Sequence, residues 1–150
     1  MAERATASIT VAAPQAAVLA VIADFEAYPD WASGIRSAKV LERDGSGRAV
    51  AVRFDLDAGL IKDTYVIGYR WDGEAGVRWD LAEPGAVVSG MSGGYQLTAR
   101  PGATEVTYEL AVDVRVPMPG ILKRRAEKMI IDTALKGLKQ RVETQGGEER

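Results

Sequence analysis

The chain has 150 residues, no cysteine and no histidine, and its formal net charge is −2. This composition excludes disulfides, thiol chemistry, imidazole metal ligands and catalytic pairs that need Cys or His. The length predicts one domain, and a hydrophobic fraction of 47% is sufficient for a core. The slight negative charge argues against general nucleic-acid binding, so we expect no nucleic-acid partner.

The first segment changes from a strand pattern to a helix pattern. Residues 4–11 alternate between polar and apolar types, which predicts a strand. Pro14 suits the first turn of a helix, and residues 18–22 supply an apolar face at helical spacing. A second short helix is expected around Phe25 and Tyr28.

The middle of the chain predicts an antiparallel sheet with one wet face and one covered face. Runs of alternating residues are separated by turns rich in Gly, Pro and Asp, and this pattern is typical of successive hairpins. The expected strands are 35–43, 48–57, 62–71, 76–82, 88–99 and 104–116. The pair Gly93-Gly94 interrupts the fifth of them.

A long helix is predicted from Ile121 to about Val142, because Pro and Gly residues end the last strand and a helical period follows. Its length is roughly 30–35 Å, which is enough to cross a sheet. We expect a broad apolar stripe of this helix to face the sheet; its residues are Leu122, Ala126, Met129, Ile130, Thr133 and Ala134, continued by Leu138 and Val142. Residues 144–150 are predicted to form a flexible tail, which leaves a domain over 1–143.

This order of elements predicts an α+β helix-grip fold. A curved antiparallel sheet of about seven strands would carry two short helices after its first strand and a long C-terminal helix across its concave face. A curved sheet and a straight helix do not meet flush, so either large side chains or a ligand must fill the space between them.

The sequence also resembles a known group of proteins, the START-like SRPBCC superfamily and, within it, the polyketide cyclase/dehydrase and coenzyme Q-binding-protein-like group. The resemblance covers residues 4–143 and rests on four segments: APQAAVLAVIADFEAYPDW, KDTYVIGYRW, VTYELAVDVRVPMPG and KRRAEKMIIDTALKGLKQRVE. It implies the helix-grip fold. It implies no single function, because carriers, receptors, aromatases and hydrolase-like proteins share this scaffold.

Alternation in the strands places many aromatic residues and few charges on the covered face. The predicted ligand-binding residues are Phe54, Tyr65, Ile67, Tyr69, Trp71, Trp79, Tyr95, Tyr108, Leu110, Val112, Leu122, Met129 and Ile130. Tyr and Trp carry a polar group on a large apolar body, which suits a lipid-, quinone- or polyketide-like ligand with one or two oxygens. An aromatic stripe is also typical of a filled core, and the sequence leaves both interpretations open.

Two further features bear on this site. Asp63 shares a face with Tyr65, so it is either a general base with a raised pKa or a strand-end residue at the solvent edge. Leu60, Ile61 and Met118 are apolar residues in connections, and we predict that they border an entrance. The alternative for the first two is that they fold back onto the long helix.

Three functions therefore remain open. The leading hypothesis is binding or transport of a hydrophobic small molecule between sheet and helix, with no cofactor and no metal. The second is an aromatase/cyclase-type enzyme that uses Asp63 and a tyrosine for proton transfer. The third is a module that contacts a membrane or a protein.

The third hypothesis rests on charge, because residues 118–143 contain seven Lys/Arg and three Asp/Glu, a balance of +4. Such a helix either contacts an acidic surface, including transient membrane contact, or is a solvated cationic face. A monomer or a homodimer is compatible with the sequence. No segment is long and apolar enough to span a bilayer and no signal peptide is predicted, so we expect a cytoplasmic location.

Overall fold

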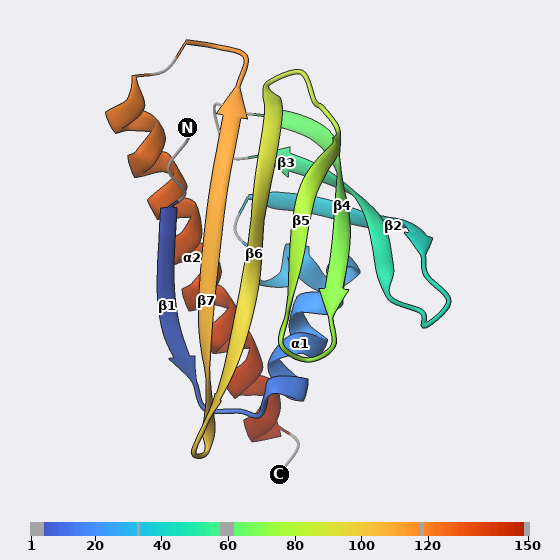
Figure 1. Cartoon of the computed structure of the whole chain (residues 1–150), viewed down its shortest axis with the longest axis vertical. Helices are drawn as coiled ribbons and strands as arrows, with labels where there is room; N and C mark the ends of the chain where they lie inside the picture. Colours follow the sequence, from blue (N-terminus) through green and yellow to red (C-terminus); the bar gives the residue numbers. More distant parts are fainter. Residues whose placement is uncertain (1–4, 33, 58–61, 118, 149–150) are drawn as a thin grey trace.

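The structure is a computed structural model that describes residues 5–32, 34–57, 62–117 and 119–148, the last four of these as backbone only. One antiparallel sheet contains seven strands in the order β1-β7-β6-β5-β4-β3-β2 (Figure 1). The strands are β1 Ala5–Val11, β2 Ile35–Arg43, β3 Ala49–Asp57, β4 Lys62–Asp72, β5 Gly76–Glu83, β6 Val88–Arg100 and β7 Ala103–Val114. The predicted sheet is confirmed, and every predicted boundary lies within two residues of the observed one.

Three helices lie on one side of this sheet (Figure 1). They are α1 Gln15–Ala23, the 3-10 helix η1 Phe25–Asp30 and α2 Gly120–Glu148. Pro14 precedes α1 with a φ of −71°, which a proline ring favours, and its carbonyl accepts the first hydrogen bonds of the helix. The two short helices after the first strand are thus confirmed. The long helix continues to Glu148, past its predicted end near Val142.

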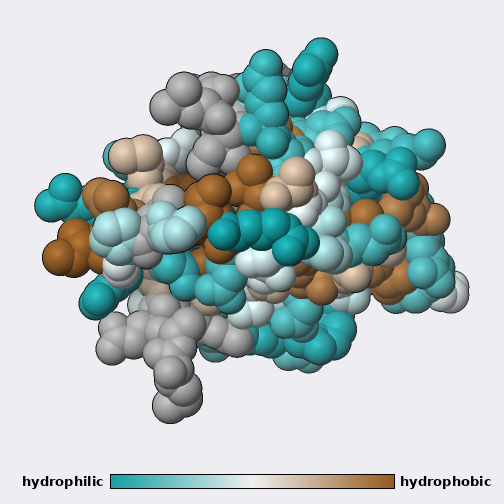
Figure 2. Space-filling view, turned by 90° about the horizontal axis from the view of Figure 1, so that it is seen from above, coloured by the Kyte–Doolittle hydropathy of each residue, from teal (hydrophilic) through white to brown (hydrophobic). Residues whose placement is uncertain are grey.

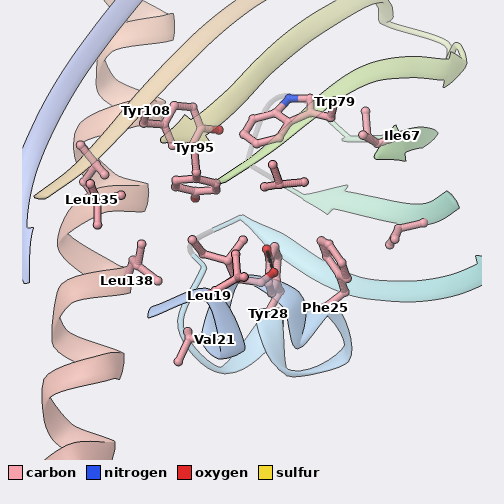
Figure 3. Packing of buried hydrophobic residues seen from close by; sticks show 14 of the residues in the cluster. Leu19, Val21, Phe25, Tyr28, Ile67, Trp79, Tyr95, Tyr108, Leu135 and Leu138 are labelled. Carbon is pink, nitrogen blue, oxygen red and sulfur yellow. Dashed lines mark hydrogen bonds between the residues drawn. The ribbon is translucent and has the colours of Figure 1, made fainter. Parts of the chain in front are cut away.

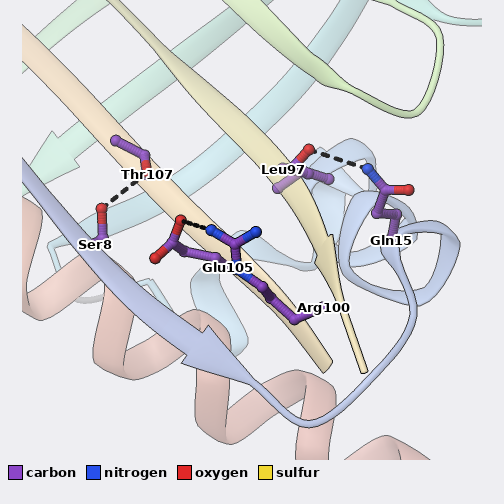
Figure 4. A network of polar contacts seen from close by, with 6 residues as sticks. All are labelled: Ser8, Gln15, Leu97, Arg100, Glu105 and Thr107. Carbon is purple, nitrogen blue, oxygen red and sulfur yellow. Dashed lines mark hydrogen bonds and ion pairs between the residues drawn. The ribbon is translucent and has the colours of Figure 1, made fainter. Parts of the chain in front are cut away.

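Polar contacts fix α1 and the neighbouring strands at one end of the sheet (Figure 4). Gln15 Nε2 donates to the Leu97 carbonyl at 3.0 Å, which ties the start of α1 to β6. On the outer face, the hydroxyls of Ser8 and Thr107 lie 2.8 Å apart and join β1 to β7. The Gln15 contact holds the start of α1 against β6, and the buried residues of α1 and η1 belong to the core.

The core lies between the concave face of the sheet and the three helices. Phe25, Ile67, Leu110, Ile131 and Leu138 are at most 2% exposed and come from η1, β4, β7 and α2. α2 contacts β1, β7 and α1, α1 also contacts β6 and β7, and η1 contacts β2.

The predicted sheet-facing side of α2 is confirmed at Leu138 and Val142, which are buried, and is wrong along the first turns of the helix. Leu122, Met129 and Ile130 are 52%, 69% and 48% exposed. The buried positions are Glu127, Ile131, Leu135, Leu138 and Val142, which repeat at helical spacing. The helix carries two apolar stripes, and only this second one continues into the C-terminal half, where Lys139 donates to the Thr10 carbonyl of β1 and Gly137 lies close to the backbone of Trp31. Packing along that half fixes the rotation of the whole helix.

Candidate ligand-binding site

Aromatic side chains form a continuous row across the concave face of β4 to β7. Tyr69 and Trp79 are opposite each other in register, and their ring centroids lie 5.9 Å apart. The ring of Trp79 lies 5.4 Å from that of Tyr95 and 5.5 Å from that of Tyr108. Figure 3 shows Tyr95, Tyr108 and Trp79 beside one another, with Leu135 of α2 near them. The alternation of inward and outward side chains along each strand therefore brings the predicted aromatic residues of four strands together.

Gly93 makes the space that the Trp79 indole occupies. Gly93 pairs with Trp79 across β5 and β6, and a Cβ at this position would lie 2.9 Å from Trp79 Cζ2. The same Cβ would lie 2.4 Å from the backbone oxygen of Glu109. The glycine pair that interrupts the strand pattern in the sequence is therefore required for close packing of the aromatic row.

The tyrosine hydroxyls of the row differ from the Tyr28 hydroxyl in their hydrogen bonding. Tyr28 donates its hydroxyl hydrogen to the Ile22 carbonyl at 2.5 Å. Within the described part of the chain, the hydroxyls of the other four tyrosines, Tyr65, Tyr69, Tyr95 and Tyr108, have no hydrogen-bond partner. Three of these residues, Tyr65, Tyr95 and Tyr108, are only 7–8% exposed. Among the described residues, Trp31 Nε1 is the one fully buried side-chain polar atom without a partner, so the hydroxyl oxygens of the row keep contact with solvent and can reach an acceptor on a ligand.

Burial keeps these hydroxyls protonated. It raises the pKa of Tyr65 to about 12, with a further contribution from the nearby charge of Asp63. Burial also raises the pKa of Tyr69, Tyr95 and Tyr108 well above the usual value, and repulsion between neighbouring phenols adds to the effect. At neutral pH the row therefore offers O–H donors and no phenolate base.

The other predicted strand residues lie around this row. Phe54, Ile67 and Leu110 are buried, whereas Trp71 and Val112 are partly buried and pack against the core. Trp71 is held at the margin, because its Nε1 donates to the Ala49 carbonyl at 2.7 Å. The predicted helix residues Leu122, Met129 and Ile130 are not part of the cluster, and the predicted entrance residues Leu60, Ile61 and Met118 lie outside the described residues.

An open depression of about 690 Å³ lies at the end of β3 and the start of β4. Its lining residues are Arg36, Asp55, Leu56, Asp57, Lys62, Asp63, Thr64 and Ala86. Leu56 and Asp63 are opposite each other in register, and the next pair on the same face is Phe54 and Tyr65. The depression is therefore one inward-facing pair away from the aromatic row.

Asp63 anchors the connection between β5 and β6. Its Oδ1 accepts the N–H groups of Thr64 at 3.0 Å and Ala86 at 2.7 Å, and its Oδ2 accepts those of Val87 at 3.1 Å and Val88 at 2.7 Å. Burial raises the pKa of this carboxyl, but the four backbone hydrogen bonds outweigh burial and lower the pKa overall. The raised pKa expected of a general base is therefore not found. Asp63 is 8% exposed and lines the open depression near the start of β4, so it is a strand-end residue that is largely buried.

Sequence reasoning missed a second buried carboxylate, Glu127 of α2. Glu127 is 2% exposed and accepts the N–H of Val112 at 2.7 Å. In the described residues, the pairing of β1 with β7 begins at Ala5 opposite Leu110, so Val112 of β7 has no partner on β1. The Glu127 carboxylate accepts the N–H of Val112 instead. The available signal was the position of Glu127 four residues before Ile131, on the stripe that the structure buries. Within the described residues, no three potential metal ligands of the Asp, Glu, His or Cys types lie together.

Comparison with known proteins places this geometry in context. Residues 2–143 match the model of a family described as polyketide cyclase / dehydrase and lipid transport. No relative among curated proteins matches the sequence.

Three solved structures share the fold at low sequence identity. A START superfamily protein from Mycobacterium smegmatis has a TM-score of 0.87 and 23% identity, over 95% of this chain and 98% of that one. The protein TTHA0849 from Thermus thermophilus has a TM-score of 0.79 and 22% identity, over 95% and 99%. The ZhuI aromatase/cyclase from Streptomyces sp. R1128 has a TM-score of 0.74 and 18% identity, over 94% and 93%.

Proposed function

The chain belongs to the polyketide cyclase/dehydrase and lipid transport family, and we propose that it binds a neutral, hydrophobic small molecule with acceptor oxygens against the aromatic row. The observation that carries this proposal is the group of hydroxyls without partners on the tyrosines of the row. A ligand oxygen that replaces solvent at one of these hydroxyls gains a hydrogen bond of about 0.5–1.5 kcal/mol. The surrounding rings supply apolar contact.

The charges of the site support a neutral ligand. Asp63 and Glu127 are the buried charged residues among those described, and both carboxylates already accept backbone N–H groups. Because no buried Lys or Arg lies among the described residues, an anionic group would be desolvated there without a counter-ion. We therefore expect a ligand with ketone, quinone or ether oxygens to bind better than its carboxylate analogue.

Aromatase/cyclase-type catalysis is the alternative, and it is supported by the likeness to the ZhuI fold. Such a reaction needs a group that removes a proton. Asp63 is occupied by four N–H donors and has a lowered pKa, while burial holds the tyrosines in their protonated form. The residues of the row suit hydrogen bonding to a carbonyl better than proton abstraction.

Native mass spectrometry after incubation with lipid and polyketide extracts tests the proposal. We expect a bound species in the wild-type protein, and quenching of tryptophan fluorescence then gives its affinity. The variant Tyr95→Phe/Tyr108→Phe should bind this ligand about threefold to tenfold more weakly for each hydrogen bond that it loses. Tyr28→Phe is the matched control, because the Tyr28 hydroxyl is already used inside the protein. Only bare protein in the spectra, or equal affinity of the double variant and the wild type, would contradict the proposal.

A further inference from the structure

Large exposed apolar side chains are concentrated at one place on the molecule. Among the described residues, six such side chains are exposed, and five of them lie between positions 116 and 130. These five are Val116, Ile121, Leu122, Met129 and Ile130, which are 48–69% exposed; the sixth is Leu41 of β2. Figure 2 shows hydrophobic atoms at the left of the end view, on the side where α2 begins in Figure 1. A cluster of this kind marks an interaction surface.

The exposed apolar stripe of α2, which contains Leu122 and Met129, points away from the core. A residue advances by about 100° around an α-helix, so Leu122 lies about 180° from the buried Ile131, and Met129 about 160°. The core therefore cannot cover both stripes at once. The first three turns of α2 consequently present their apolar side chains to whatever surrounds the protein.

The same three turns carry a concentrated positive charge. Lys123, Arg124, Arg125 and Lys128 lie there, and Glu127, which is the acidic residue of this stretch, is buried against Val112. Lys123 is paired with Asp113 of β7 at 2.8 Å. Arg125 and Lys128 are exposed and have no ion-pair partner among the described residues. This cationic apolar surface belongs to a chain whose net charge is −2.

We propose that the first three turns of α2, together with Val116, dock onto an anionic lipid bilayer. Apolar side chains that enter the boundary between headgroups and acyl chains, flanked by Lys and Arg at the phosphates, are the usual chemistry of interfacial helices. A second copy of this chain fits less well, because its cationic side chains would meet their own like charges. The proposal goes beyond the ligand site and does not depend on what occupies the aromatic row.

The position of this docking surface links it to the depression. The N–H of Arg115 donates to the Val87 carbonyl at 2.8 Å, and Arg115 Nε donates to the Gly85 carbonyl at 3.3 Å. Ala86, between those two residues, lines the depression. Val116 is therefore adjacent to a segment that borders the depression, and docking would bring that border close to the bilayer.

Flotation of the ligand-free protein with vesicles tests the proposal without reference to any cargo. The probes are vesicles of phosphatidylcholine alone and of phosphatidylcholine with phosphatidylglycerol, each at low and high salt. We expect binding to the anionic vesicles at low salt and loss of binding at high salt. The charge variant Arg125→Gln/Lys128→Gln should partition about 25-fold more weakly. Its matched control is Lys39→Gln/Arg53→Gln on the strands β2 and β3, which should bind like the wild type.

A second pair of variants tests the apolar contribution. Leu122→Ser/Met129→Ser should reduce partitioning by about tenfold or more, because both side chains lose apolar burial in the bilayer. Leu41→Ser, an exposed apolar residue on β2, is the control and should have no effect. All variants change exposed side chains, and thermal melts verify that they are folded.

Three outcomes would overturn the docking proposal. The first is no flotation with anionic vesicles at low salt. The second is equal binding to vesicles with and without phosphatidylglycerol. The third is a dimer in size-exclusion chromatography that Leu122→Ser/Met129→Ser dissociates while vesicle binding is absent, which would assign the surface to self-association. Each of these results leaves the test of ligand binding by native mass spectrometry unaffected.

Discussion

Asp63 offers a quantitative test of how the structure is held together. Each of its carboxylate oxygens accepts two backbone N–H groups, at 2.7–3.1 Å. In the variant Asp63→Asn one oxygen remains, and the amide hydrogens face two N–H groups that then have no acceptor. Two charge-assisted hydrogen bonds of about 1.5–3 kcal/mol each are lost. We therefore expect the free energy of unfolding to fall by about 3–6 kcal/mol, and Tm by roughly 6–24 °C.

The pH dependence of this effect follows from the lowered pKa of Asp63. A carboxyl whose pKa is lower in the folded than in the unfolded protein stabilises the fold above the unfolded pKa, which is about 4. This stabilisation is lost as the pH falls through the folded pKa. The difference in stability between the wild type and Asp63→Asn should therefore be constant near neutral pH and shrink below about pH 4.

Urea unfolding followed by far-UV circular dichroism measures both effects. Asp80→Asn is a suitable control, because the Asp80 side chain is 55% exposed and, among the described residues, its ion pair is with Arg70 at the surface. Its effect should be below about 1 kcal/mol. The reasoning would be refuted if Asp63→Asn were no more destabilising than Asp80→Asn, or if its effect persisted unchanged in acid.

Three further predictions concern packing in the ligand-free protein, and urea unfolding checks each of them. Tyr28→Phe should lower the free energy of unfolding by about 1 kcal/mol, because it loses the hydrogen bond to the Ile22 carbonyl. Tyr108→Phe has no such hydrogen bond to lose among the described residues and should leave the free energy of unfolding unchanged or raise it. A larger loss of stability for Tyr108→Phe than for Tyr28→Phe would contradict this. Gly93→Ala should destabilise by about 1–3 kcal/mol and shift tryptophan fluorescence, because its Cβ would meet an indole at 2.9 Å; an unchanged spectrum would argue against that contact. Gly137→Ala should destabilise the protein although alanine has the better helix propensity, because the new Cβ would lie 2.8 Å from the backbone oxygen of Trp31. Gly45→Ala is the control and should be neutral, because no atom lies within 4 Å of a Cβ at that position.

The strands and their inward faces were predictable because the information is local. In β7 the side chains alternate strictly, so Tyr108 and Leu110 are assigned to the covered face without knowledge of any partner strand. A shift of one residue would expose the whole apolar set to water, which makes the register unambiguous. The aromatic row could therefore be read from the sequence, apart from the glycine that gives Trp79 its space.

The rotation of α2 was not predictable in the same way. The helix has two apolar stripes, and the sequence alone does not say which of them meets the sheet. The choice depends on contacts far along the chain: α1 and β1 pack against the C-terminal half, and Gly137 lets the backbone of Trp31 approach closely. The structural role of Asp63 was hidden for a related reason, because three of its four donors lie 23 to 25 residues away, in the connection between β5 and β6 and at the first residue of β6.

The two stripes of α2 also explain why the helix is so unevenly charged. Along its C-terminal half, Leu135, Leu138 and Val142 are buried. Charged side chains there tie the helix to its neighbours, because Lys139 Nζ donates to the Thr10 carbonyl and Glu143 accepts the N–H of Ala12. Along its first turns, the exposed side combines Leu122 and Met129 with cationic neighbours, and solvation alone gives no reason for large apolar residues at these positions. An apolar stripe within a cationic surface is instead what a bilayer interface selects. The exposed apolar stripe of α2, which was wrongly predicted to face the core, thus supports a docking surface beside the ligand site.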